Sequence, residues 1–185
     1  VVVLGGGVVG TNAVRMAMGM EAHVTVIDKS LARLKELDFR FGGMLNTIFA
    51  TREATQRHVT GADLVVGAVH GHFGLGRRKQ TERLLKAIDH RYFSILAHPA
   101  TRLLGEREPI DFDLERVVQH CAERGAFLEL NSQPQRLDMD DAACRLAAGH
   151  GVLVSVASDA HCPEDFADLE CGVTQARRGW LGAAQ

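Results

Sequence analysis

The chain has 185 residues, which allows one domain of ordinary size or two small ones. Hydrophobic residues make up 46% of it, enough for a core at this length, and this argues against a disordered chain. The formal net charge of -2 argues against a protein dedicated to nucleic acid or to a membrane surface, whose phosphate contacts require an excess of basic residues.

Seven short apolar runs predict buried strands, at residues 1–4, 23–27, 45–49, 64–69, 93–97, 126–130 and 152–157. Six stretches between them have helical spacing, at residues 8–20, 31–39, 53–60, 77–89, 114–124 and 139–150. Ser30 and Asp113 stand where helix caps belong, and Gly125 and Gly151 follow predicted helix ends. Strands alternating with helices indicate βαβ units, so the predicted fold class is α/β.

None of the apolar runs is longer than one strand, so we expect no membrane partner. The chain begins in a strand-like run without the charged segment and apolar core of a secretory signal. Its four cysteines include no C-x-x-C pair, and a chain of this length needs no disulfide framework. We therefore expect a cytoplasmic protein.

The first strand leads directly into a glycine-rich segment in which Gly5, Gly7 and Gly10 have G-x-G-x-x-G spacing. In a strand–turn–helix, such glycines permit a tight turn, close approach of the backbone to a pyrophosphate, and close packing of helix on strand. Asp28 ends the next strand, where a carboxylate accepts hydrogen bonds from an adenosine ribose and repels a 2′-phosphate. The pattern favours NAD over NADP. The alternative is a strand–helix turn without a ligand, with Asp28 as a helix cap.

The segment VVVLGGGVVGTNAVRMAMGMEAHVTVIDKSLARLKELDFRFGG resembles the NAD-binding domain of alanine dehydrogenases, and the likeness continues to about Ala68. The resemblance implies a Rossmann half that holds NAD through Gly5, Gly7, Val8, Val9, Gly10, Asp28 and Arg33. The catalytic His and Lys of that family belong to a substrate domain with no counterpart in this sequence.

Several polar side chains occur where predicted strands end, and parallel strands bring such ends to one edge of a sheet. They are His70, His98, Glu129, Asn131, Asp159 and His161. Neutral imidazoles with a carboxylate suit Zn²⁺, Mn²⁺ or Fe²⁺, and a bound metal can activate water for hydrolysis. A single histidine at a strand end is more often structural, but several at one edge indicate a site.

Residues from about 64 to 181 resemble the C-terminal part of the PHP domain of bacterial X-family DNA polymerases. The carrying segments include Leu96-Ala97-His98-Pro99, Glu129-Leu130-Asn131 and Ser158-Asp159-Ala160-His161. The resemblance implies that His70, His98, Asp159 and His161 correspond to metal ligands of a phosphoesterase centre. The other ligands of that centre have no counterpart in this sequence.

The two resemblances meet within residues 62–70, which predicts a chimera of a Rossmann half, residues 1–69, and a PHP-like half, residues 70–185. The simplest explanation is an engineered, recombinant join. We expect a single domain over 1–185 with an open, doubly wound parallel sheet of Rossmann-like order 3-2-1-4-5-6-7. A closed (β/α) barrel is the alternative.

Three functions follow from this reading. The first is a scaffold that binds NAD or an adenosine nucleotide weakly, without evolved catalysis and without a specific nucleic-acid partner. The second is a metal-dependent phosphoesterase or 3′–5′ exonuclease of PHP type. The third is a folded scaffold without any ligand. The sequence leaves the oligomeric state open.

Overall fold

A computed structural model describes residues 1–7 and 10–185. The chain divides into two compact units. The first comprises Val1–Asp63 with His161–Pro163, and the second comprises Leu64–Ala160 with Glu164–Gln185. Each unit has a parallel sheet and a hydrophobic core of its own.

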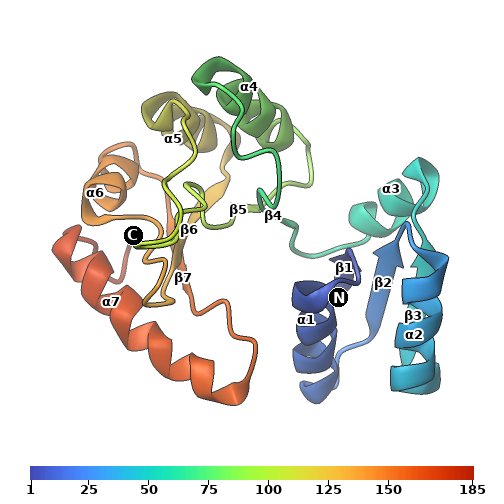
Figure 1. Ribbon diagram of the computed structural model, residues 1–185. Coiled ribbons are helices and arrows are strands. Elements are labelled where there is room, and N and C mark those ends of the chain that lie inside the picture. The colour runs from blue at the N-terminus through green and yellow to red at the C-terminus, as the bar shows by residue number, and fades with distance from the viewer. The chain divides into compact units, whose positions relative to one another are not determined.

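The first unit is built from strands and helices in alternation (Figure 1). They are β1 (Val2–Leu4), α1 (Val8–Gly19), β2 (Val24–Asp28), α2 (Leu31–Phe41), the 3₁₀ turn η1 (Gly42–Met44), β3 (Leu45–Phe49) and α3 (Arg52–Thr60). The strands pair in the order β1-β2-β3. In this register Ile27 lies between Leu4 and Ile48, so the carboxyl ends of the three strands meet at one edge.

Local signals explain where these helices begin and end. The Ser30 hydroxyl accepts a hydrogen bond from the Arg33 N–H and caps α2, as the sequence predicts. Gly42 follows α2 with a φ of 61°, a conformation that favours glycine. Side chains of α1 and α2 then pack with β2 and β3 to form the core: Val14, Val24, Val26, Leu34, Leu37 and Leu45.

The second half of the chain repeats the same alternation. Its elements are β4 (Val66–Gly67), α4 (Arg77–Ile88), β5 (Ile95–Leu96), α5 (Leu114–Arg124), β6 (Phe127–Asn131), α6 (Asp141–Gly149), β7 (Val154–Ala157), the 3₁₀ segment η2 (Pro163–Asp168) and α7 (Leu169–Arg178). The strands pair in consecutive order, β4-β5-β6-β7. Right-handed crossovers between consecutive neighbours place the helices on one side of a sheet, and α4 to α7 follow one another in this way (Figure 1).

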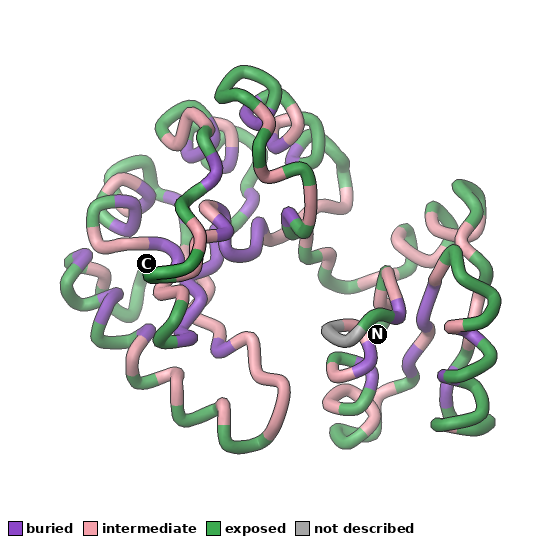
Figure 2. The backbone as a smooth tube through the Cα atoms, in the orientation of Figure 1, coloured by how far each residue is buried: buried purple, intermediate pink, exposed green. Residues whose placement is uncertain are grey.

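The larger core lies between this sheet and its helices, where Figure 2 shows the buried segments of the second unit. Val117, Val118, Leu128 and Leu130 are fully buried in it. The cap signals agree with the sequence: Asp113 accepts the Arg116 N–H at the start of α5. Gly125 ends that helix in the left-handed region, with a φ of 68°.

The predicted α/β class with parallel strands is confirmed, as are the orders 3-2-1 and 4-5-6-7 within the two parts of the chain. The strand pairs form two sheets instead of the expected single one, since pairing between β1 and β4 is not found in the described residues. The ladder of β4 has only two residues, Val66 and Gly67, and therefore offers few hydrogen bonds for a further strand. A closed barrel is not formed by the described strands, because β4 and β7 end their sheet without pairing with each other.

The sequence-based elements omit α7 and η2. Within the described part of the chain, no helix is both long enough and apolar enough to cross a bilayer.

Candidate functional site

The glycine-rich loop joins β1 to α1, and its first and last glycines, Gly5 and Gly10, are required for different reasons: the backbone conformation at Gly5 and the lack of space at Gly10. Gly5 has a φ of 96°, and its N–H donates a 2.8 Å hydrogen bond to the carbonyl of Ile27. A Cβ on Gly10 would lie 1.8 Å from the carbonyl oxygen of Gly5, so the start of α1 packs directly on the turn. A tight turn and close helix–strand packing of this kind are typical of dinucleotide-binding loops.

The glycines between them differ in their surroundings. A Cβ on Gly6 would lie 2.6 Å from Cδ1 of Leu37, so α2 packs tightly against this part of the loop. A Cβ on Gly7 would meet no atom within 4 Å. Gly7 is the N-cap residue of α1 and thus faces open space at a helix N-terminus, the position at which a pyrophosphate approaches such a loop. Val8 and Val9, also expected to line this loop, lie outside the described residues.

Asp28 ends β2 beside the loop. Its Oδ2 accepts a 2.6 Å hydrogen bond from the Gly6 N–H, and its Oδ1 accepts a 2.7 Å hydrogen bond from the Ser30 N–H. These two bonds are the main reason that the pKa of Asp28 is lowered from its usual value. The carboxylate is therefore ionised at neutral pH, and each oxygen keeps a lone pair that a ribose hydroxyl could use.

A pocket of about 350 Å³ opens at the carboxyl ends of β1 and β2. Its lining combines these strand ends with the start of α3: Leu4, Gly5, Ile27, Asp28, Lys29, Ala50 and Thr55. The volume lies at the small end of the range for ligand pockets, roughly 300–1,000 Å³. Arg33, the last of the expected cofactor residues, reaches the loop from α2 and donates to the carbonyl of Gly6.

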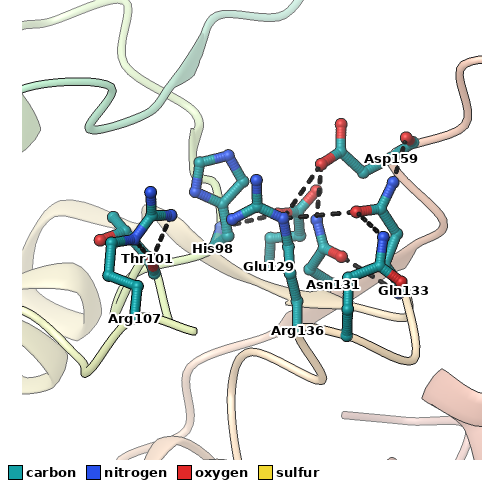
Figure 3. A network of polar contacts seen from close by, with 9 residues as sticks. His98, Thr101, Arg107, Glu129, Asn131, Gln133, Arg136 and Asp159 are labelled. Atoms are coloured by element: carbon teal, nitrogen blue, oxygen red, sulfur yellow. Dashed lines mark hydrogen bonds and ion pairs between the residues drawn. The ribbon is translucent and has the colours of Figure 1, made fainter. Parts of the chain in front are cut away.

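A second group of polar side chains lies in the second unit, at the carboxyl ends of its strands (Figure 3). His98 follows β5, Glu129 and Asn131 belong to the end of β6, and Asp159 follows β7. His70, beyond β4, makes an edge contact with His98 in which the ring centroids are 5.2 Å apart. The structure thus brings several of the expected strand-end residues together.

His98 is a buried member of this cluster. Its N–H donates a 2.6 Å hydrogen bond to Oε2 of Glu129, while its ring Nδ1 is buried without a hydrogen-bond partner among the described residues. Burial, followed by the charge of Arg136, lowers the pKa of His98 to about 4. Burial also raises the pKa of Glu129 to about 7. Because the pKa of His98 is about 4, its imidazole is neutral at physiological pH.

Arg136 places a positive charge beside these groups. Its Nε lies 3.7 Å from Oδ2 of Asp159 and 3.3 Å from Oε1 of Gln133. Asn131 donates a 3.1 Å hydrogen bond to the same Asp159 oxygen. The Asp159 carboxylate is thus engaged by a cation and an amide. Burial, with the charge of Arg136 as a smaller contribution, lowers the pKa of both His70 and His98.

The cluster has some of the ligand atoms that a divalent metal needs, but its charge and its ligand set are unsuitable. The unpartnered Nδ1 of neutral His98 is a suitable ligand atom, and the ring of His70 contacts the ring of His98 edge-on. However, the positive charge of Arg136 opposes a second cation, and His161 groups with the first unit. Among the described residues, no three or more His, Cys, Asp or Glu side chains are placed to hold a metal ion. A complete metal centre therefore does not fit the observed arrangement.

Sequence reasoning missed three residues that shape this cluster, namely Gln133, Arg136 and Asp138. All three lie in the segment that follows β6, where a strand end with Gln, Arg and Asp close behind is a usable signal. Their charge and amide groups are largely enclosed, which only the fold reveals.

Residues 1–72 match the family model described as alanine dehydrogenase/PNT, C-terminal domain. Alanine dehydrogenase of Halomonas elongata is 54% identical over 69 residues, covering 37% of this chain and 19% of that protein. Alanine dehydrogenase 2 of Staphylococcus aureus is 40% identical over 86 residues, covering 46% and 23%. A solved L-alanine dehydrogenase is 29% identical, covers 52% of this chain and 26% of its own, and has a TM-score of 0.37.

The DNA polymerase/3′-5′ exonuclease PolX of Bacillus subtilis is 33% identical over 118 residues, covering 64% of this chain and 21% of that protein. The chain spans about a fifth of the length of the curated relatives it matches. It therefore joins two segments that match unrelated families: residues 1 to about 70 are similar to the alanine dehydrogenase/PNT C-terminal domain, and residues from about 64 to 181 are similar to a PolX DNA polymerase.

Proposed function

We propose that this chain is an engineered chimeric scaffold whose first unit binds NAD(H), or an adenosine nucleotide, weakly and without evolved catalysis. The observation that carries the proposal is the glycine loop. Gly5 and Gly10 have the geometry of a dinucleotide-binding turn, Gly7 faces open space, and Asp28 stands at the rim of the adjoining pocket.

The similarity of the first 72 residues to the alanine dehydrogenase/PNT C-terminal domain supports this choice of ligand. NAD would be held by the loop glycines at its pyrophosphate and by Asp28 at its adenosine ribose. When bound, it would supply hydride-transfer chemistry. The matched segment provides a binding loop, and we expect no turnover of NAD(H) with pyruvate or alanine.

The proposal of an engineered join rests on where the two similarities meet. The family match ends at residue 72, the PolX similarity begins near residue 64, and the compact units divide between Asp63 and Leu64. A junction at a unit boundary leaves each core intact, which is what a designer of chimeras seeks.

Titration calorimetry with NADH and NADPH tests the binding proposal. The wild-type chain should bind NADH more tightly than NADPH, because the Asp28 carboxylate repels a 2′-phosphate. Asp28→Asn should weaken NADH binding and reduce the preference, whereas Asp38→Asn on the exposed side of α2 should change neither. Equal affinity for the two nucleotides, or no binding at millimolar NADH, would contradict the proposal.

A second candidate is metal-dependent phosphoester hydrolysis, favoured by the contact between the rings of His70 and His98 and by the unpartnered Nδ1 of His98. We propose that the chain holds at most one weakly bound Zn²⁺ or Mn²⁺ and lacks exonuclease activity, because Asp159 already forms an ion pair with Arg136. Elemental analysis after dialysis tests the second candidate. Two or more retained metal ions per chain, with Mn²⁺-dependent nuclease activity, would support the phosphoesterase.

A further inference from the structure

We infer that Arg33 is a positioning residue of the proposed nucleotide site: its guanidinium fixes the backbone of the glycine loop and leaves nucleotide contact to other groups. This inference rests on the proposed function and assigns Arg33 a different role from the direct NAD contact that the resemblance implies. All three guanidinium nitrogens of Arg33 donate hydrogen bonds to residues of the loop, α1 or α2.

The contacts of Arg33 converge on the turn between β1 and α1. Nε donates to the carbonyl of Gly6, and Nη2 donates a 2.7 Å hydrogen bond to the hydroxyl of Thr11. That hydroxyl donates in turn to the carbonyl of Gly7 at 2.8 Å. Nη1 pairs with Glu36 at 2.6 Å, which holds the guanidinium against its own helix.

Both backbone polar groups of Gly6 are consequently hydrogen-bonded to side chains. Its N–H donates to Asp28 at 2.6 Å, and its carbonyl accepts from Arg33. Cδ1 of Leu37, one helical turn beyond Arg33, would lie 2.6 Å from a Cβ on Gly6. The end of β2 and the first turns of α2 therefore determine the conformation of the loop.

Such a restraint matters because three consecutive glycines are conformationally permissive. A free loop would have to lose this freedom when a pyrophosphate binds, and the loss would weaken the affinity. With its peptide groups already fixed, the loop presents open space at Gly7 and the N-terminus of α1 without further ordering. Arg33 thus strengthens binding of the pyrophosphate without touching the nucleotide.

The test compares Arg33→Met and Arg33→Lys with Lys35→Met, a matched loss of charge at an exposed position of the same helix. Calorimetry measures NADH, ADP and adenosine, which differ in whether they carry a pyrophosphate. Arg33→Met should weaken NADH and ADP by about tenfold, the loss expected from one net hydrogen bond to a charged group. Adenosine affinity should stay nearly constant, Arg33→Lys should be intermediate, and Lys35→Met should match wild type.

Amide hydrogen exchange without ligand gives a readout independent of nucleotide binding. Arg33→Met should accelerate exchange in a peptide covering residues 5–11 and leave the remainder of the first unit protected. Adenosine affinity that falls as much as ADP affinity would show a direct nucleotide contact and overturn the inference. Unchanged exchange and affinity, or loss of protection across residues 1–63, would overturn it as well.

If the first unit does not bind nucleotides at all, the two experiments give a different combination of results. If wild type binds none of the three ligands while Arg33→Met still accelerates exchange in the loop, the nucleotide site is absent although Arg33 holds the turn. The role of Arg33 in nucleotide binding is then overturned together with the proposed function.

Discussion

The glycines of the loop have different roles, and the free space around the Cβ position of each one distinguishes these roles. Gly10 is required for the fold, because a Cβ there would meet the backbone of Gly5 at 1.8 Å. Gly7 has open space around it, so a methyl group would obstruct only a molecule that enters from outside.

We therefore expect Gly10→Ala to destabilise the first unit by about 1–3 kcal/mol, the usual cost of overpacking. Gly7→Ala should leave the stability of this unit nearly unchanged and abolish NADH binding. Denaturation followed by circular dichroism measures the first effect and calorimetry the second. Equal stability losses in the two variants would show that the loop packs differently from the structure.

The ionised carboxylate of Asp138 destabilises the folded state. It is completely buried, and its Oδ1 accepts a 3.1 Å hydrogen bond from the Ala100 N–H. Burial outweighs such bonds and raises the pKa of Asp138 to about 6. Between about pH 4 and pH 6 the folded state therefore holds a proton that the unfolded state has released.

The free energy of unfolding contributed by Asp138 should accordingly fall as the pH rises from about 4 to 6. The decrease is at most roughly 3 kcal/mol, from a shift of about two pKa units. Asp138→Asn should remove this decrease, so its stability relative to wild type should grow over the same interval. Urea denaturation at several pH values tests this. A constant difference across pH 4–7, as expected for the exposed control Asp111→Asn, would refute it.

At the scale of elements, α7 packs on its sheet through a glycine. A Cβ on Gly172 would lie 1.9 Å from Oγ of Ser132 and 2.8 Å from Cγ1 of Val156. The helix therefore approaches β6 and β7 more closely than any residue with a side chain would permit. By contrast, Gly149 at the end of α6 has no atom within 4 Å of its Cβ position.

Gly172→Ala should destabilise the second unit by about 1–3 kcal/mol, because both Ser132 and Val156 must move. Gly149→Ala should be neutral or stabilising by up to about 1 kcal/mol, since alanine favours a helix. Thermal denaturation of both variants provides the comparison. Similar melting temperatures would mean that α7 does not pack against β6 in solution.

At the scale of the whole molecule, the two cores are composed of different residues. Val14 and Leu37 belong to the core of the first unit, whereas Leu128 and Val117 belong to that of the second. Each core has its own sheet, so hydrophobic burial in one does not depend on burial in the other.

We expect calorimetry to resolve two unfolding transitions, with the smaller first unit contributing the smaller enthalpy. Gly10→Ala should lower the temperature of only that transition, and Gly172→Ala only the other. One transition that both variants shift equally would indicate a single cooperative domain over residues 1–185.

The sequence by itself determined the elements and the family likenesses. Continuous apolar runs and cap residues such as Ser30 and Asp113 act locally, so the α/β class and most helix limits could be derived from them. Helix α7 was not predicted, because Gly172 weakens its helical pattern. That glycine is needed for close packing against Ser132, which is distant in the sequence.

Only the tertiary structure decided how the strands combine and which charges meet. The formation of two sheets depends on how much of β4 forms a ladder, which its apolar sequence does not reveal. The enclosure of His98 by Arg136 and Glu129, and the hold of Arg33 on Gly6, join residues 27 or more positions apart. Local patterns predict elements because neighbouring residues interact through the backbone, but desolvation and charge pairing depend on distances that only the fold establishes.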